Sequence, residues 1–159
     1  MVFLQAAARR DSVAAACLRL AEEKHVELCL SPPILSEIHD VLSRPQIRSR
    51  FTTLNDTLVK DFLTALSSCA RIYPEVREHV GFARDPNDEP YLNLAIEAQA
   101  RYLASRDNDL LDLRNSGDPF AVGFRQSFPT LQILEPLEFL REIRRELIPN
   151  PQRGPSLGR

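Results

Sequence analysis

The chain has 159 residues, 43% of them apolar, and a formal net charge of −2. This length predicts one domain with a sizeable core, and the near-neutral charge gives no global attraction to nucleic acid, so any polyanion must be held by local basic patches. No apolar run approaches membrane-spanning length, and the three scattered cysteines (Cys17, Cys29 and Cys69) predict reduced thiols in a cytoplasmic protein that has no membrane partner.

Short apolar strands alternate with helical patterns along the chain. Residues 2–4 read as the end of a buried strand, and residues 115–128, with two glycines, read as a loop. The other predicted strands cover residues 26–30, 71–74, 101–105 and 131–134. The predicted helices cover residues 12–23, 32–44, 54–70, 89–100, 108–113 and 136–147.

This alternation predicts an α/β fold with a central parallel sheet and helices on both faces. The sheet has about five strands if residues 2–4 count as one. We expect the folded domain to cover residues 1–148. Residues 149–159 carry three of the chain's twelve prolines, and we expect them to form a disordered tail.

Acidic residues gather between residues 84 and 113, where seven acids face three arginines. Asp88 and Glu89 sit at the mouth of a predicted helix, and Asp107 and Asp109 follow a predicted strand. A helix mouth and the carboxyl end of a strand can converge in the crevice where α/β sheets bind ligands. Close-set carboxylates repel one another unless a cation offsets their charge, so we predict a divalent metal site.

Each candidate also has a simpler interpretation. Glu37 lies on the edge of a helical apolar stripe, where it could reach solvent or pair with an arginine instead of binding a metal. Asp88, Glu89 and Asp107 could act only as helix caps. Asp109 could lie on a solvated face, and Asp85 could organise a turn.

The residue types restrict the metal and the chemistry. The histidines show no ligand spacing and no Cys-x-x-Cys pair occurs, so oxygen ligands favour Mg²⁺ or Mn²⁺ over zinc. Such ions can activate water and stabilise the charge that develops in phosphodiester hydrolysis. Arg44 and Arg48, or the arginines near residue 144, could hold backbone phosphates, unless they form only solvated helix faces. The sequence also lacks a Gly-rich phosphate loop and a Gly-x-Ser-x-Gly elbow.

Four segments in order resemble the PIN-domain nucleases, and the branch that looks closest is the toxin components of prokaryotic toxin–antitoxin systems. They read VFLQA from residue 2, LSPPILSEI from residue 30, RDPNDEPYLNLA from residue 84 and YLASRDNDLL from residue 102. The resemblance implies an α/β/α sandwich and metal-dependent cleavage of RNA. It also implies a cognate antitoxin as partner, and toxins of this family commonly form homodimers.

Carried over residue by residue, the resemblance implies catalytic and metal-binding roles for Glu37, Asp107 and either Asp88 or Glu89. Asp109 is a further candidate metal ligand. Ser105 matches the small hydroxyl residue that often precedes the last acid by two positions. We group Ser105 with Arg44 and Arg48 as candidate RNA contacts.

The chain departs from the family pattern at its start. The family opens with an apolar strand ending in Asp-x-Asn-Val, whereas this chain opens Met1-Val2, so the first aspartate and most of the first strand are missing. Either the start is misassigned or the chain is a decayed copy. We therefore expect a weakened metal site and little nuclease activity.

Two other functions compete with the nuclease. One is a catalytically inactive PIN-like module that binds RNA or protein. The other is a phosphotransfer receiver, but that fold needs an acid after the first strand and a lysine after a late strand. The last predicted strand leads instead into Glu135-Pro136.

Overall fold

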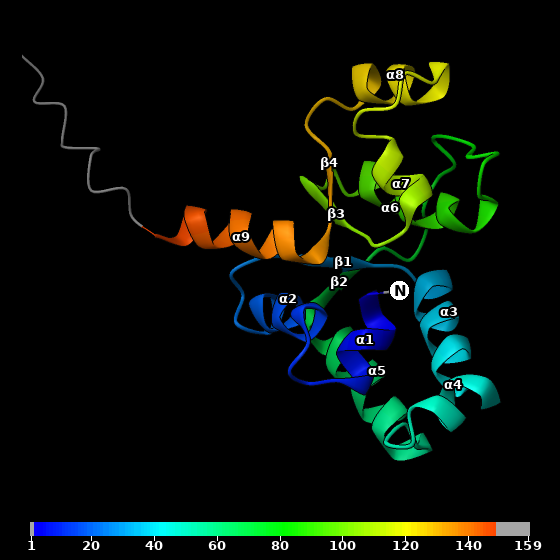
Figure 1. Ribbon diagram of the computed structural model, residues 1–159, viewed down its shortest axis with the longest axis vertical. Helices are drawn as coiled ribbons and strands as arrows, with labels where there is room; N and C mark the ends of the chain where they lie inside the picture. The colour runs from blue at the N-terminus through cyan, green and yellow to red at the C-terminus, as the bar shows by residue number, and fades with distance from the viewer. Residues whose placement is uncertain (1, 149–159) are drawn as a thin grey trace, which may run out of the picture.

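The computed structural model describes residues 2–148, so the disordered tail expected at residues 149–159 lies outside the described residues. Helices dominate the described part of the chain (Figure 1). The elements in chain order are α1 (Val2–Ala8), α2 (Val13–Glu22), β1 (Leu28–Leu30), α3 (Pro32–Ser43), α4 (Pro45–Arg50), α5 (Asp56–Cys69), β2 (Ala70–Ile72), the 3-10 turn η1 (Pro86–Asp88), α6 (Glu89–Glu97), β3 (Tyr102–Ala104), α7 (Asn108–Asp112), α8 (Pro119–Ser127), β4 (Gln132–Leu134) and α9 (Pro136–Leu147).

The strands form two separate parallel pairs. β1 pairs with β2, with Leu28 opposite Ala70, and β3 pairs with β4, with Tyr102 opposite Gln132. The expected α/β class and parallel pairing are confirmed. The expected five-stranded sheet is wrong, because residues 2–148 contain four three-residue strands in two sheets of two.

Residues 2–4 do not form a strand, which corrects the reading of the first segment. They begin α1, whose sequence continues with Gln5 and three alanines. Alanine is the strongest helix former, and three apolar residues are too few to set a strand against it. Ala6 and Ala7 are buried, and α1 packs against α2 and α3.

The loop expected at residues 115–128 is also wrong, because most of it is α8. Asp118 caps this helix by accepting a hydrogen bond from the Ala121 amide at 3.1 Å, and Pro119 occupies its first turn. Phe120 and Phe124 lie on one face of α8 with their ring centroids 6.2 Å apart. A cap, a proline and an aromatic face are helix signals that outweigh two glycines.

The remaining predicted elements are confirmed, with boundaries that shift by a few residues at most. Ser12 caps α2 through the Ala15 amide at 3.1 Å, and α9 spans Pro136–Leu147 as expected. Helix α4, which follows α3 directly, was not expected from the sequence. Among residues 2–148, no helix is long and apolar enough to cross a membrane.

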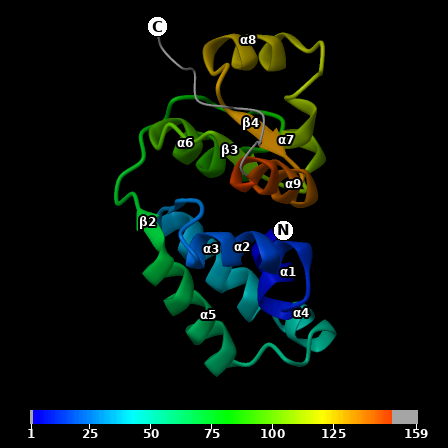
Figure 2. The same cartoon turned by 90° about the vertical axis from the view of Figure 1, so that its left-hand side faces the viewer.

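The core has two main parts that meet near α6. One part gathers Leu30, Ile34, Ile38 and other apolar side chains around β1, α3 and α5, and a second lies around β3, β4, α7 and α8. Helix α6 contacts both β1 and β3, and α9 packs on β3, β4 and α2. Figure 2 shows α6, α7 and α8 in one half and α1 to α5 in the other. Helix α6 therefore contacts elements of both halves.

Candidate metal centre

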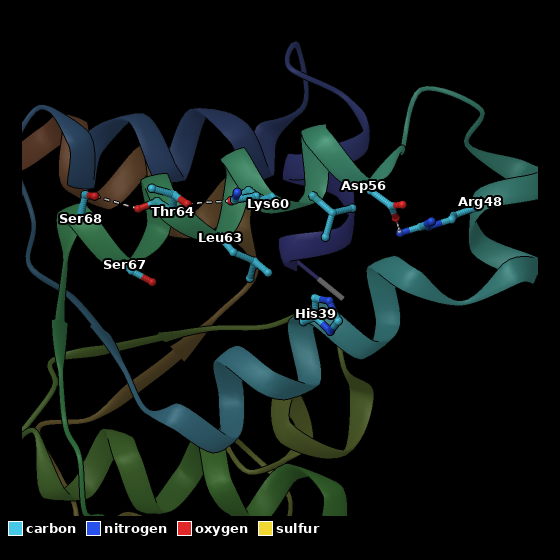
Figure 3. A pocket seen from close by; sticks show the side chains of 9 residues that line it. His39, Arg48, Asp56, Lys60, Leu63, Thr64, Ser67 and Ser68 are labelled. Atoms are coloured by element: carbon cyan, nitrogen blue, oxygen red, sulfur yellow. Dashed lines mark hydrogen bonds and ion pairs between the residues drawn. The ribbon is translucent and has the colours of Figure 1, made fainter.

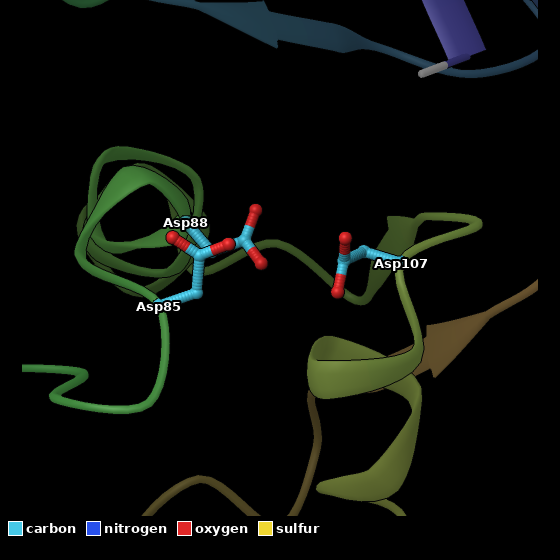
Figure 4. A group of neighbouring side chains, drawn as sticks. All are labelled: Asp85, Asp88 and Asp107. Carbon is cyan, nitrogen blue, oxygen red and sulfur yellow. The ribbon is translucent and has the colours of Figure 1, made fainter.

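Three aspartates converge where β3 ends and α6 begins. Asp85, Asp88 and Asp107 each offer one carboxylate oxygen, and the three oxygens lie within 4.8 Å of one another (Figure 4). Asp85 precedes η1, Asp88 is the N-cap residue of α6, and Asp107 is the N-cap of α7 after β3. The convergence of a helix mouth with a strand end is the geometry that the sequence led us to expect.

Asp85 organises a turn and also joins the cluster. Its Oδ1 accepts hydrogen bonds from the Asn87 amide at 2.9 Å and the Asn87 side chain at 3.0 Å, and Pro86 starts the 3-10 turn behind it. The turn role was the simpler interpretation of Asp85 in the sequence. Asp85 lies three residues before Asp88, which is one turn of 3-10 helix. This spacing is the sequence signal from which its membership of the cluster could have been predicted.

Ser105 and Asp109 hold the backbone around Asp107. The Asp107 amide donates to Ser105 Oγ at 3.0 Å, and the Asp109 amide donates to Asp107 Oδ1 at 2.8 Å. The Ser105 amide in turn donates to the Leu134 carbonyl at 2.9 Å, which extends the pairing of β3 with β4. Asp107 is therefore anchored to the sheet on one side and to α7 on the other.

Asp88 has the environment of a metal ligand. Its Oδ2 is buried and, within the described residues, has no hydrogen-bond partner. Burial raises the pKa of Asp88 to about 6, and the negative charges of Asp107, Asp85, Asp109 and Glu37 add to the effect. A buried acceptor without a donor, beside two further carboxylates, fits a hard divalent cation such as Mg²⁺ or Mn²⁺.

Glu37 reaches the edge of this group from α3. The Tyr91 hydroxyl donates to Glu37 Oε2 at 2.8 Å, which joins α3 to α6. Burial and this hydrogen bond raise the pKa of Tyr91, so its hydroxyl stays protonated as a donor. Glu37 is not one of the three grouped carboxylates, but its charge is among the causes of the raised pKa of Asp88.

Glu89 and Asp109 point to other partners. Glu89 Oε1 accepts a hydrogen bond from the Phe82 amide at 2.6 Å, on the loop that precedes the cluster. Asp109 pairs with Arg84 at 3.1 Å, and the same guanidinium reaches Asp112 at 3.2 Å. Of the predicted ligands, the structure thus brings Asp88 and Asp107 together, and it adds Asp85 to them.

Comparison with known families gives one match. The family described as PIN domain matches residues 1–109, a span that contains Glu37 and all three grouped aspartates. The chain belongs to the PIN-domain family. PIN domains are generally nucleases and usually bind divalent metals, which agrees with the acidic cluster at the mouth of α6. Comparisons with curated proteins and with solved structures returned no match.

The predicted RNA contacts Arg44 and Arg48 lie elsewhere on this PIN domain. They belong to the junction of α3 with α4 and to α4 itself, at the opposite end of α3 from α6 and α7 (Figure 1). Arg48 pairs with Asp56 at 2.7 Å and donates from Nε to the Leu42 carbonyl at 3.3 Å. It lines an open groove of about 640 Å³ between α3 and α5, with His39 and Lys60 (Figure 3).

Proposed function

We propose that this PIN domain is a metal-dependent ribonuclease that hydrolyses RNA phosphodiester bonds. The proposal rests chiefly on the three converging carboxylates of Asp85, Asp88 and Asp107, together with the buried, unpartnered Oδ2 of Asp88. Mg²⁺ or Mn²⁺ is the cofactor that such an oxygen-only donor set favours.

The chain's own residues have distinct roles in this proposal. Asp85, Asp88 and Asp107 hold the cation, and Glu37 presents a fourth carboxylate whose orientation is set by the Tyr91 hydroxyl. A divalent ion bound there supplies charge neutralisation and lowers the pKa of a coordinated water. Ser105 keeps Asp107 at the end of β3 through the hydrogen bond from the Asp107 amide.

The nuclease assay uses single-stranded RNA with Mn²⁺ or Mg²⁺ and the purified chain. We expect weak cleavage by the wild type, none after chelation, and a further loss of at least about 100-fold in Asp88→Asn, since removing a ligand that neutralises transition-state charge costs several kcal/mol. Asp61→Asn is the matched control, because Asp61 is an exposed aspartate on α5 outside the cluster. Equal cleavage by wild type and Asp88→Asn would refute the proposal.

A second candidate is a PIN-like module that binds RNA or protein without cleaving RNA. This candidate is favoured because two of the predicted metal ligands already accept hydrogen bonds within the protein. Glu37 accepts one from the Tyr91 hydroxyl, and Glu89 accepts one from the Phe82 amide. Only three carboxylates then remain grouped within residues 2–148. This function predicts RNA binding that Asp88→Asn leaves unchanged, without cleavage under any metal condition.

The family context extends the proposal to a biological role. We propose that the enzyme acts in the cytoplasm as the toxin of a toxin–antitoxin pair, is neutralised by a cognate antitoxin protein, and forms a homodimer. Expression of the wild type should slow bacterial growth, and expression of Asp88→Asn should not. Growth inhibition of equal strength by both forms would separate the toxicity from the metal cluster.

A further inference from the structure

One face of α6 carries three polar side chains at helical spacing, all directed at the same extended segment. Glu89, Asn93 and Glu97 are four residues apart, so they lie on one side of the helix. Each of them accepts hydrogen bonds from residues 77–82, the segment that leads from β2 toward the aspartate cluster. We call this segment the entry loop.

Asn93 lies at the centre of this contact. Its Oδ1 accepts from the amides of His79 at 2.7 Å and Val80 at 2.9 Å, and its Nδ2 donates to the Val80 carbonyl at 3.0 Å. Asn93 is only 6% exposed, and Ser31 is the other buried polar residue in the described part of the chain. A buried amide is costly unless it is hydrogen-bonded, so the entry loop and Asn93 depend on each other.

Two further α6 residues flank Asn93 and also bind the entry loop. We call these three side chains and their hydrogen bonds to the entry loop the clamp. Glu89 accepts from the Phe82 amide at 2.6 Å. Glu97 accepts from His79 Nε2 at 2.6 Å and from Arg77 at 3.1 and 3.2 Å. The entry loop has no strand partner among residues 2–148, so these α6 side chains satisfy amides that a sheet would otherwise pair.

The entry loop ends close to the cluster. The Phe82 side chain is buried in the second core with Leu92 and Leu110, and Asp85 follows it by three residues. Beyond it, Arg84 pairs with Asp109 and Asp112 on α7. Asp85 is therefore carried by a short span whose start is fixed by α6.

We propose that Asn93 is a positioning residue that holds Asp85 in the metal cluster by clamping the entry loop to α6. In the same arrangement Glu89 acts as part of the clamp and not as a metal ligand. The inference deepens the proposed metal centre and rests on it. Residues that orient metal ligands typically change metal affinity by about 10- to 100-fold when they are removed.

The first test is a double-mutant cycle on Mn²⁺ affinity, measured by titration of the purified chain. Asn93→Leu removes the central contacts of the clamp, and we expect it to weaken Mn²⁺ binding about 10-fold. If Asn93 acts through Asp85, the same change in an Asp85→Asn background adds less than about twofold, because residues that act as a unit are not additive. An equal loss in both backgrounds would overturn the inference.

Glu89→Gln tests the clamp with a variant that conserves shape. The glutamine Oε1 can still accept from the Phe82 amide, but the residue no longer offers a carboxylate. We expect Mn²⁺ affinity to stay within about twofold of the wild type, in contrast to Asp88→Asn, since Glu89 is not one of the grouped carboxylates. A loss in Glu89→Gln as large as that in Asp88→Asn would make Glu89 a ligand and refute its clamp role.

Amide hydrogen exchange of the metal-free protein gives a readout that does not depend on the metal. The Asn87 amide donates to Asp85 Oδ1 at 2.9 Å, so its protection reports whether Asp85 is in place. We expect Asn93→Leu to increase exchange at Val80 and Asn87. The matched control Asn55→Leu, which removes the α5 cap to Leu58, should leave both amides unchanged.

The outcomes separate the clamp from the metal centre. Failure of the wild type to bind Mn²⁺ would refute the metal centre, and exchange at Asn87 would then decide by itself whether Asn93 holds Asp85. Unchanged Asn87 exchange in Asn93→Leu would refute the clamp even if the wild type binds Mn²⁺ and cleaves RNA.

Discussion

The acidic side chains near the two ends of α3 differ in whether a basic side chain pairs with them. At the α4 end, Arg48 pairs with Asp56 at 2.7 Å beside an open groove. At the α6 end, within residues 2–148, none of the three clustered aspartates pairs with a lysine, arginine or histidine, and a buried Asp88 oxygen lacks any donor. At the α4 end the protein supplies the opposite charge itself, whereas the carboxylates at the α6 end fit the cation that we propose. This contrast separates the surface at α4 from the candidate metal centre.

The largest expected effect is stabilisation by the metal at the α6 end. Mn²⁺ at 100 times its dissociation constant should raise the free energy of unfolding by about 2.7 kcal/mol, because it binds only the folded cluster. Denaturant titration with and without Mn²⁺ measures this difference. Asp88→Asn should remove most of the gain and the Asp61→Asn control should keep it, so an equal gain in both variants would place the ion elsewhere.

A second effect is the pH dependence of the metal-free protein. The pKa of Asp88 is about 6 in the fold against an ordinary value of 3.8, so the folded state binds more protons between these values. Stability should therefore fall as pH rises from about 4 to about 6 and then level off, by about 1 to 2 kcal/mol after allowance for solvent screening.

Urea unfolding in chelator across this pH range measures the loss. Asp88→Asn should remove most of the slope, because its amide does not titrate. A slope that persists undiminished in Asp88→Asn would show that other groups cause it.

Tyr91→Phe should have a smaller effect at the same end of α3. It removes the hydroxyl that donates to Glu37 Oε2 and leaves the ring in place. We expect a loss of about 1 kcal/mol or less in stability and a few-fold loss in RNA cleavage, since a single hydrogen bond to a carboxylate is modest in net terms. Unchanged thermal unfolding and unchanged cleavage together would show that Glu37 does not depend on Tyr91.

The smallest effect is expected at the α4 end. Arg48→Ala breaks the pair with Asp56, whose side chain is 89% exposed, so the stability loss should be below about 1 kcal/mol. Mn²⁺ affinity should not change, because α4 lies away from the cluster. If Arg48 contacts RNA as the sequence led us to expect, RNA affinity should fall and its salt dependence should weaken. A loss of Mn²⁺ affinity in Arg48→Ala would remove the contrast between the two ends.

Local sequence signals were sufficient for much of the fold. Helix α9 and the Ser12 cap of α2 follow from periodicity and capping residues, which act within a few positions. The same signals placed acids at the mouth of α6 and after β3. They were insufficient at residues 2–4, where a short apolar run could not distinguish strand from helix, and for α8, where Gly117 and Gly123 suggested a loop.

The sequence by itself determined the family, the acidic character of the centre, and the grouping of Asp107 with an acid at the mouth of α6, either Asp88 or Glu89. Only the tertiary structure decided which neighbouring acid faces the others. Adjacent helical residues point about 100° apart, so the packing of α6 against the entry loop turns Glu89 toward Phe82 and leaves Asp88 beside Asp107. The pairing of strands into two separate sheets is likewise set by contacts between distant segments, which no local pattern encodes.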